Sequence, residues 1–276
     1  MERTEQQIRE QEHQEDLAKL RRLRPIDDDF MRCMFRDNKP LAQLVLRILT
    51  GKQDLIVQEL ETQADFKRLV GARSIMLDAY LTDTESKKYD MEVQRADRGA
   101  DKHRARYHSS AMDIENLNAG QNFDELPETY TIIITENDFF GDGKPFHRIE
   151  RVDLDSEGKP LFNDEEHILY VNGAYHGDNE IGKLMHDFRC WNPDDMNYEL
   201  MKNAARYYKE NPKGVAIMCE AFEETRKAGE EKGEMKRAIQ TAKRMIARGK
   251  MTLKEIAEDV GLPLEQVQEL AGVKAG

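Results

Sequence analysis

Residues 75–94 alternate between apolar and polar side chains, and this alternation limits the folds open to the chain. The apolar residues that recur at every second position are Ile75, Leu77, Ala79, Leu81, Tyr89, Met91 and Val93. A period of two is typical of strands that bury one face. The turn-rich sequence TDTESKK separates the two runs. We therefore expect an antiparallel hairpin at 75–94.

Helices and further strands surround the expected hairpin. Apolar residues at helical spacing predict helices at 28–35 and 41–50, and the aliphatic run YTIIIT (130–135) predicts a strand covered on both faces. A weakly helical segment before that run implies a crossover helix. Strands also fit 146–155 and 165–175, and helices dominate beyond Glu180. The sequence thus predicts an α/β fold with a mixed central sheet flanked by helices.

The expected domain organisation has three parts: a charged N-terminal arm at 1–24, a main domain at 25–205 and a helical extension at 206–276. The extension ends in a helix-turn-helix-like pattern with a capping box from Thr252 to Glu255 and a break at Gly261. Its last helix presents mostly Glu and Gln, so we expect an interaction or oligomerisation module, with a homo-oligomer as one outcome. The basic sequence KRAIQTAKRMIARGK before it leaves DNA reading open.

Composition excludes several classes of protein. The 276 residues carry a net charge of -12, and a mean hydropathy of -0.79 argues against a membrane protein. The N-terminal residues lack the pattern of a secretory leader, so a cytoplasmic location is expected. The three cysteines show no CxxC spacing, which argues against a zinc ribbon or a disulfide framework.

The hairpin brings polar side chains together on the face opposite its apolar rows. Burial of both apolar rows on one side requires paired residue numbers with an even sum, which places Asp78 opposite Glu92 or opposite Gln94. Cross-strand neighbours of this kind have Cβ atoms about 5 Å apart. Two such carboxylates repel unless a cation holds them, and Mg²⁺ prefers oxygen ligands. Acidic residues on the outer face of a strand are also common without a metal.

The sequences LDAYLTD and YDMEVQ, followed by RARYHSS, resemble the D...(D/E)xK pattern of the restriction-endonuclease-like nuclease superfamily. Glutamine stands at position 94, where most members have lysine, and this form is similar to the recombination-promoting nuclease and putative transposase family. The opening IDDDFMRCMF, the strand YTIIIT, the block LMHDFRC followed by PDDM, and the closing capping-box segment extend the resemblance from about residue 25 to the C-terminus. The resemblance implies a restriction-endonuclease-like core at 25–205.

It also implies metal-dependent hydrolysis of DNA phosphodiester bonds. Asp78, Glu92 and the carbonyl of Val93 would then hold Mg²⁺, with Mn²⁺ as an alternative. Gln94 would orient a water, because an amide cannot take up a proton near neutral pH. Asp90, on the same face, is a candidate extra ligand, although the interpretation as a solvated or turn-supporting carboxylate is favoured. His103 and His108 are not expected to form a metal pair.

A local excess of positive charge follows the hairpin. The candidate DNA-contacting residues are Arg95, Arg98, Lys102, Arg104 and Arg106. They could lie along the phosphate backbone in a sequence-independent way, or they could belong to a solvated helix face with i,i+4 ion pairs. The rival function is a noncatalytic DNA-associated or regulatory protein that keeps the nuclease fold.

Overall fold

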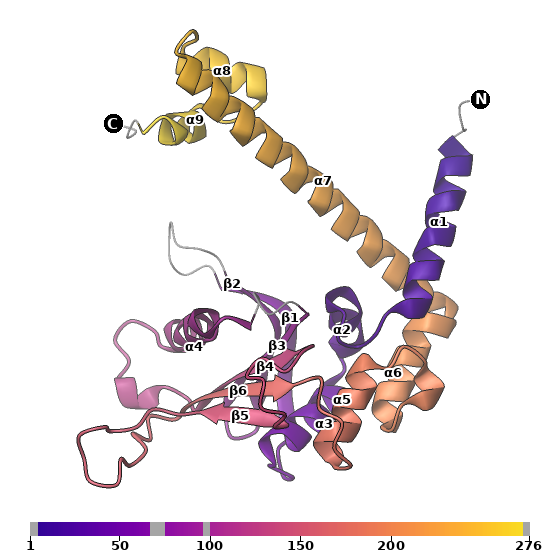
Figure 1. Cartoon of the computed structure of the whole chain (residues 1–276), viewed down its shortest axis with the longest axis vertical. Coiled ribbons are helices and arrows are strands. Elements are labelled where there is room, and N and C mark those ends of the chain that lie inside the picture. The colour runs from indigo at the N-terminus through magenta and orange to yellow at the C-terminus, as the bar shows by residue number, and fades with distance from the viewer. Residues whose placement is uncertain (1–4, 67–74, 96–99, 273–276) are drawn as a thin grey trace. The chain divides into compact units, whose positions relative to one another are not determined.

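The computed structural model describes residues 5–66, 75–95 and 100–272, and its elements are labelled in Figure 1. The chain separates into two compact units, residues 1–219 and 220–276. The boundaries at 24/25 and 205/206 expected from sequence stay predictions.

Three helices precede the sheet: α1 (Glu5–Arg22), α2 (Asp28–Phe35) and α3 (Lys39–Thr50). Helix α3 has clear end signals, because the Asn38 side chain accepts a hydrogen bond from Leu41 N at 3.3 Å and Pro40 lies in the first turn. At its C-terminus Gly51 adopts a φ of 75°, which favours glycine. The two helices expected in this region are confirmed.

The central sheet has six strands in the order β1-β2-β3-β4-β6-β5. The strands are β1 (Val57–Phe66), β2 (Ile75–Asp83), β3 (Lys88–Gln94), β4 (Thr129–Thr135), β5 (Phe146–Ile149) and β6 (Glu166–Asn172). Strands β1, β2 and β3 are antiparallel, β3, β4 and β6 are parallel, and β5 pairs antiparallel with β6. The mixed sheet and the hairpin are therefore confirmed.

Helices cover the sheet on both sides (Figure 1). Helix α4 (Lys102–Asn116) forms the crossover between β3 and β4, as the polar segment predicted, and packs against β2, β3, β4 and β6. Helices α2 and α3 pack with α5 (Glu180–Arg189) and α6 (Glu199–Glu210). Phe35 of α2 stacks on Phe188 of α5, with ring centroids 6.5 Å apart. Short 3-10 turns lie at Phe123–Glu125 and Pro193–Asp195.

The C-terminal unit contains most of α7 (Pro212–Arg248), from Glu220 onward, followed by α8 (Leu253–Val260) and α9 (Leu264–Leu270). The expected capping box is present, because Glu255 N donates to Thr252 Oγ1 at 3.3 Å and Thr252 N donates to Glu255 Oε2 at 2.7 Å. Gly261 ends α8 with a φ of 69°. This unit has a core of its own, formed by Ala242, Ile256, Ala257, Leu262 and Val267.

None of the described helices is long and apolar enough to span a membrane.

Candidate metal centre

The candidate site lies where β2 and β3 separate. Their ladder runs in the register of Tyr80 with Asp90 and ends at the pair of Ala79 with Met91. Continuing this register by one residue sets Asp78 opposite Glu92, the first of the two registers allowed by the sequence. The structure therefore brings the two carboxylates together.

Side chains replace main-chain pairing beyond the last ladder pair. Asp78 N donates to Glu92 Oε1 at 2.9 Å, and Val93 N donates to Asp78 Oδ2 at 3.2 Å. The N–H and C=O of a strand residue point to the same side, so the carbonyl of Val93 faces this gap as well. Both carboxylates and one carbonyl thus converge between the ends of β2 and β3.

Leu77 shows that β2 departs from strict alternation at this point. It forms a small cluster with Ala64 and with Met112 of α4, and Tyr80 packs against the same cluster. Residues 77 and 80 would lie on opposite faces of a regular strand. The departure coincides with the end of the β2–β3 ladder, beyond which β2 is paired with β1 alone.

Glu92 is fixed by donors from three elements. Besides Asp78 N, it accepts from Gln94 Nε2 at 3.3 Å and from Arg104 Nη2 of α4 at 3.2 Å, both at Oε2. The Glu92 carboxylate is 2% exposed, whereas the Arg104 side chain is 42% exposed. A guanidinium that reaches in from the surface therefore compensates a buried carboxylate.

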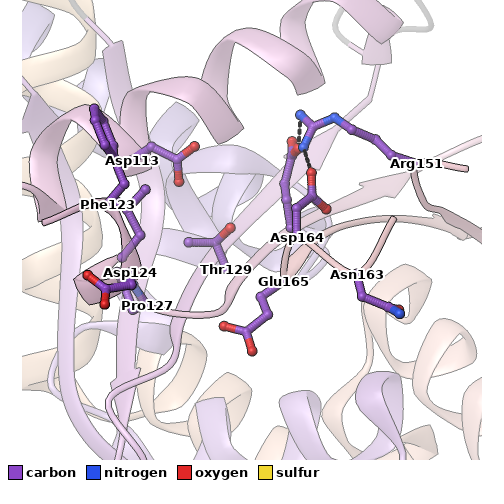
Figure 2. A pocket seen from close by; sticks show the side chains of 11 residues that line it. Asp113, Phe123, Asp124, Pro127, Thr129, Arg151, Asn163, Asp164 and Glu165 are labelled. Carbon is purple, nitrogen blue, oxygen red and sulfur yellow. Dashed lines mark hydrogen bonds and ion pairs between the residues drawn. The ribbon is translucent and has the colours of Figure 1, made fainter. Parts of the chain in front are cut away.

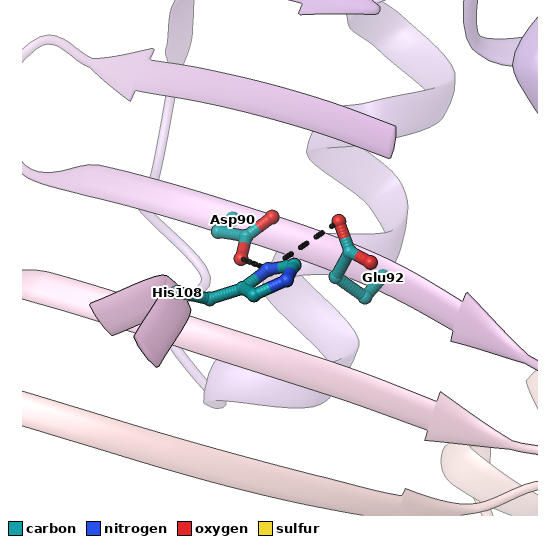
Figure 3. A group of neighbouring side chains, drawn as sticks. All are labelled: Asp90, Glu92 and His108. Carbon is teal, nitrogen blue, oxygen red and sulfur yellow. Dashed lines mark hydrogen bonds and ion pairs between the residues drawn. The ribbon is translucent and has the colours of Figure 1, made fainter. Parts of the chain in front are cut away.

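Asp90 and His108 complete the cluster. In Figure 3 the imidazole of His108, from α4, lies against Asp90 and Glu92, which extend from the same strand. His108 Nδ1 is 3.1 Å from Asp90 Oδ2 and 3.7 Å from Glu92 Oε1. One donor atom from each of Asp90, Glu92 and His108 lies within 4.8 Å of the others, a spacing that a metal ion can bridge.

The hydrogen bonds define the tautomer of His108. Arg104 Nε lies 3.3 Å from His108 Nε2, and a guanidinium only donates. His108 Nε2 is therefore an acceptor, and the ring proton is on Nδ1, where it is donated to Asp90.

Burial dominates the electrostatics of the three carboxyl groups. It raises the pKa of Asp78, and it raises the pKa of Asp90 and Glu92 well above their usual range. The negative charge of Asp78 adds to the increase in both Asp90 and Glu92. The cluster thus favours protonation or a bound cation.

One oxygen of the cluster lacks a partner. Asp90 Oδ1 and Thr131 Oγ1 are buried and have no hydrogen-bond partner among the described residues. Asp90 and Thr131 are paired in the parallel register of β3 and β4. The interpretation of Asp90 as a solvated carboxylate was wrong: its side chain is 0% exposed, because α4 crosses over this part of the sheet.

The sequence reasoning also missed His108. It considered only a pairing with His103, which the structure places on the surface beside Asp101. The one signal in the sequence was the four-residue spacing from Arg104 to His108, which puts both side chains on one face of a helix.

The basic residues after the hairpin have different surroundings. Lys102, Arg104 and Arg106 belong to α4, with Lys102 over the ring of Phe140 and Arg106 exposed. Arg95 pairs with Asp27 and Glu136 at 3.1 and 3.4 Å. Arg98 lies outside the described residues.

A separate cavity of about 360 Å³ lies at the other end of the parallel strands (Figure 2). It is lined by Thr129 and Glu166, the first residues of β4 and β6, whereas Gln94 is the last residue of β3. Its charged lining consists of Asp113, Asp124, Arg151, Asp164, Glu165 and Glu166. Arg151 is paired with Asp164 and Glu166, so this cavity offers little to a phosphate group.

A mixed sheet that carries clustered carboxylates at the divergence of two strands defines a restriction-endonuclease-like α/β protein. The model of the PD-(D/E)XK nuclease family transposases matches residues 34–186, and the chain belongs to this family. Neither a curated protein nor a solved structure matches the chain. The matched residues include Asp78, Glu92 and Gln94, together with Arg104 and His108 of α4.

Proposed function

We propose that the protein is a metal-dependent DNA endonuclease that hydrolyses phosphodiester bonds. The observation that carries the proposal is the end of the β2–β3 ladder at the pair of Ala79 with Met91. Beyond this pair, the carboxylates of Asp78 and Glu92 lie across one gap. Family membership supports a nuclease, while the metal, the DNA substrate and a role in recombination are part of this proposal.

The residues present suit a divalent cation. The gap offers carboxylate oxygens and one carbonyl, which are the ligands of Mg²⁺ and Mn²⁺. The buried and unpartnered Asp90 Oδ1 supports a compensating cation nearby. We propose that Asp78, Glu92 and the Val93 carbonyl hold Mg²⁺, or Mn²⁺ in its place.

Asp90 and His108 are assigned a supporting role. Both ring nitrogens of His108 already face partners, Asp90 Oδ2 and Arg104 Nε. The imidazole therefore helps to fix the position of the Glu92 carboxylate beside it. Such supporting contacts orient ligands and tune their basicity.

The remaining chemistry falls to Gln94 and the metal. A bound cation supplies charge compensation at the phosphate and lowers the pKa of the attacking water. Gln94 donates to Glu92 through Nε2, and its amide oxygen is suited to accept a hydrogen bond from that water. An amide orients a water without titrating, so no proton is taken up at position 94.

A plasmid-nicking assay tests the proposal. Purified protein with Mg²⁺ or Mn²⁺ should nick supercoiled DNA, and EDTA or the Asp78→Ala substitution should abolish nicking. Glu61→Ala, which removes an exposed carboxylate from β1, should nick like the wild type. Equal nicking by wild type and Asp78→Ala would indicate a contaminating nuclease and favour the noncatalytic, DNA-associated alternative.

Two further expectations belong to the same proposal. We propose a cytoplasmic location for the protein. Self-association through the C-terminal helices also stays a prediction, which the mass of the full-length protein in solution would test.

A further inference from the structure

The C-terminal unit carries a concentrated basic surface on the last part of α7. Between Met235 and Lys254 the chain contains seven Lys or Arg residues and no Asp or Glu, within a protein of net charge -12. All seven residues are exposed: Lys236, Arg237, Lys243, Arg244, Arg248, Lys250 and Lys254. We call the five of these that lie within α7, from Lys236 to Arg248, the α7 basic face.

The basic face is one side of an amphipathic helix whose other side is already occupied. At 3.6 residues per turn, its five cations fall within an arc of about 140°. The residues on the opposite side, namely Ala238, Ile239, Ala242, Met245 and Ile246, pack in the core that α8 and α9 complete. The small core of this unit therefore fixes which side of α7 is presented to solvent.

We propose that the α7 basic face binds the phosphate backbone of duplex DNA independently of sequence. From Lys236 to Arg248 the face extends over about 18 Å, and duplex DNA carries about one negative charge per 1.7 Å along its axis. Several cations can thus meet phosphates at once. The choice of DNA as the occupant rests on the proposed nuclease function.

An anionic membrane suits this surface less well. Helices that lie in a membrane interface expose an apolar face to the acyl chains, whereas the apolar side of α7 is used by α8 and α9. The last helix is equally unsuited to read bases, because its charged side chains, Glu265 and Glu269, are both acidic. In this assignment α7 provides binding and α8 and α9 provide the scaffold.

The test measures binding of the full-length protein to a fluorescein-labelled DNA duplex in EDTA, by fluorescence anisotropy at several salt concentrations. The basic-face variant replaces Lys236, Arg237, Lys243 and Arg244 with Gln. The control variant removes the same charge from exposed lysines elsewhere, namely Lys144, Lys159, Lys183 and Lys213. Glutamine is a good helix former, so helix content should be kept in both.

We expect the basic-face variant to bind DNA about tenfold or more weakly, with the slope of log affinity against log salt smaller by about 2 to 4. The control variant should keep the wild-type slope. An unchanged slope in the basic-face variant, or equal losses in both variants, would overturn the proposal. Retained DNA binding combined with lost binding to phosphatidylserine vesicles would overturn it in favour of a membrane.

A second measurement needs no substitution. Bound DNA should protect Lys236 and Lys243 of the wild type from amine acylation, while Lys144 and Lys213 stay reactive. Equal reactivity with and without DNA would contradict the proposal even if the variant failed to fold. Both measurements are made in EDTA, so neither depends on nuclease activity. Absence of nuclease activity would therefore overturn the proposed function, but the test of DNA binding by the α7 basic face would still be valid.

Discussion

His108 Nδ1 donates to Asp90 Oδ2 over 3.1 Å, and this buried hydrogen bond ties helix α4 to strand β3 beside the Glu92 carboxylate. The bond connects the crossover helix to the strand that carries Glu92 and Gln94. The position of α4 therefore bears directly on the geometry of the candidate metal centre.

Replacement of His108 with Gln should weaken metal binding and nicking by about 10- to 100-fold, as expected for a group that supports a ligand. Isothermal titration with Mn²⁺ measures the affinity directly, without DNA. The matched control is His103→Gln, on the same helix but with a side chain that is 81% exposed. Equal effects of the two substitutions would contradict the supporting role of His108.

Glu92→Gln should abolish metal-dependent nicking yet stabilise the metal-free protein at neutral pH. Burial raises the pKa of Glu92 above that of the unfolded chain. The folded state thus binds more protons, so the contribution of this group to stability falls as pH rises above the unfolded value of about 4.3.

The difference in melting temperature between Glu92→Gln and wild type in EDTA should therefore grow from about pH 4 to pH 7. Saturating Mn²⁺ should remove this advantage, because the cation stabilises only the wild-type carboxylate. A lower melting temperature of the variant at neutral pH in EDTA would show that the contacts of Glu92 outweigh its burial.

Gln94→Ala should lower kcat by roughly 10- to 100-fold, through loss of water positioning, while the affinity for Mn²⁺ changes little. Gln94→Lys introduces a titratable group at the same position. The pH–rate profiles distinguish an amide that orients water from a group that titrates. Wild type should show no titration step from residue 94, and the lysine variant should gain one. Identical profiles for wild type and Gln94→Lys would argue against water orientation by the amide.

Arg104 and Arg106 should respond differently to substitution, although only two positions separate them on α4. Arg104→Gln removes the guanidinium that compensates buried Glu92, so the melting temperature in EDTA should fall. Arg106→Gln should leave stability unchanged and reduce the salt slope of DNA binding by about 0.9, if the exposed Arg106 meets a phosphate. Thermal unfolding and anisotropy titrations of both single variants, made on an Asp78→Ala background, separate the two roles.

The hairpin and its polar row are properties of local sequence. Alternation over 75–94 allowed only registers with an even sum, because a slip of one residue would expose an apolar row. This parity was enough to predict that Asp78 and Glu92 lie near each other. The aliphatic strand at 130–135 and the capping box at Thr252 likewise depend on residues that are close in the chain.

The surroundings of the cluster were decided by tertiary structure. In the sequence, nothing distinguishes Asp90 from other polar residues of a strand. It is nevertheless buried, because the α4 crossover covers its face of the sheet. Arg104, one of the candidate phosphate-contacting residues, also reaches Glu92, twelve residues away, and His108. Periodicity specifies which residues share a face of one element, whereas the face that a crossover helix covers depends on how several strands order and pack.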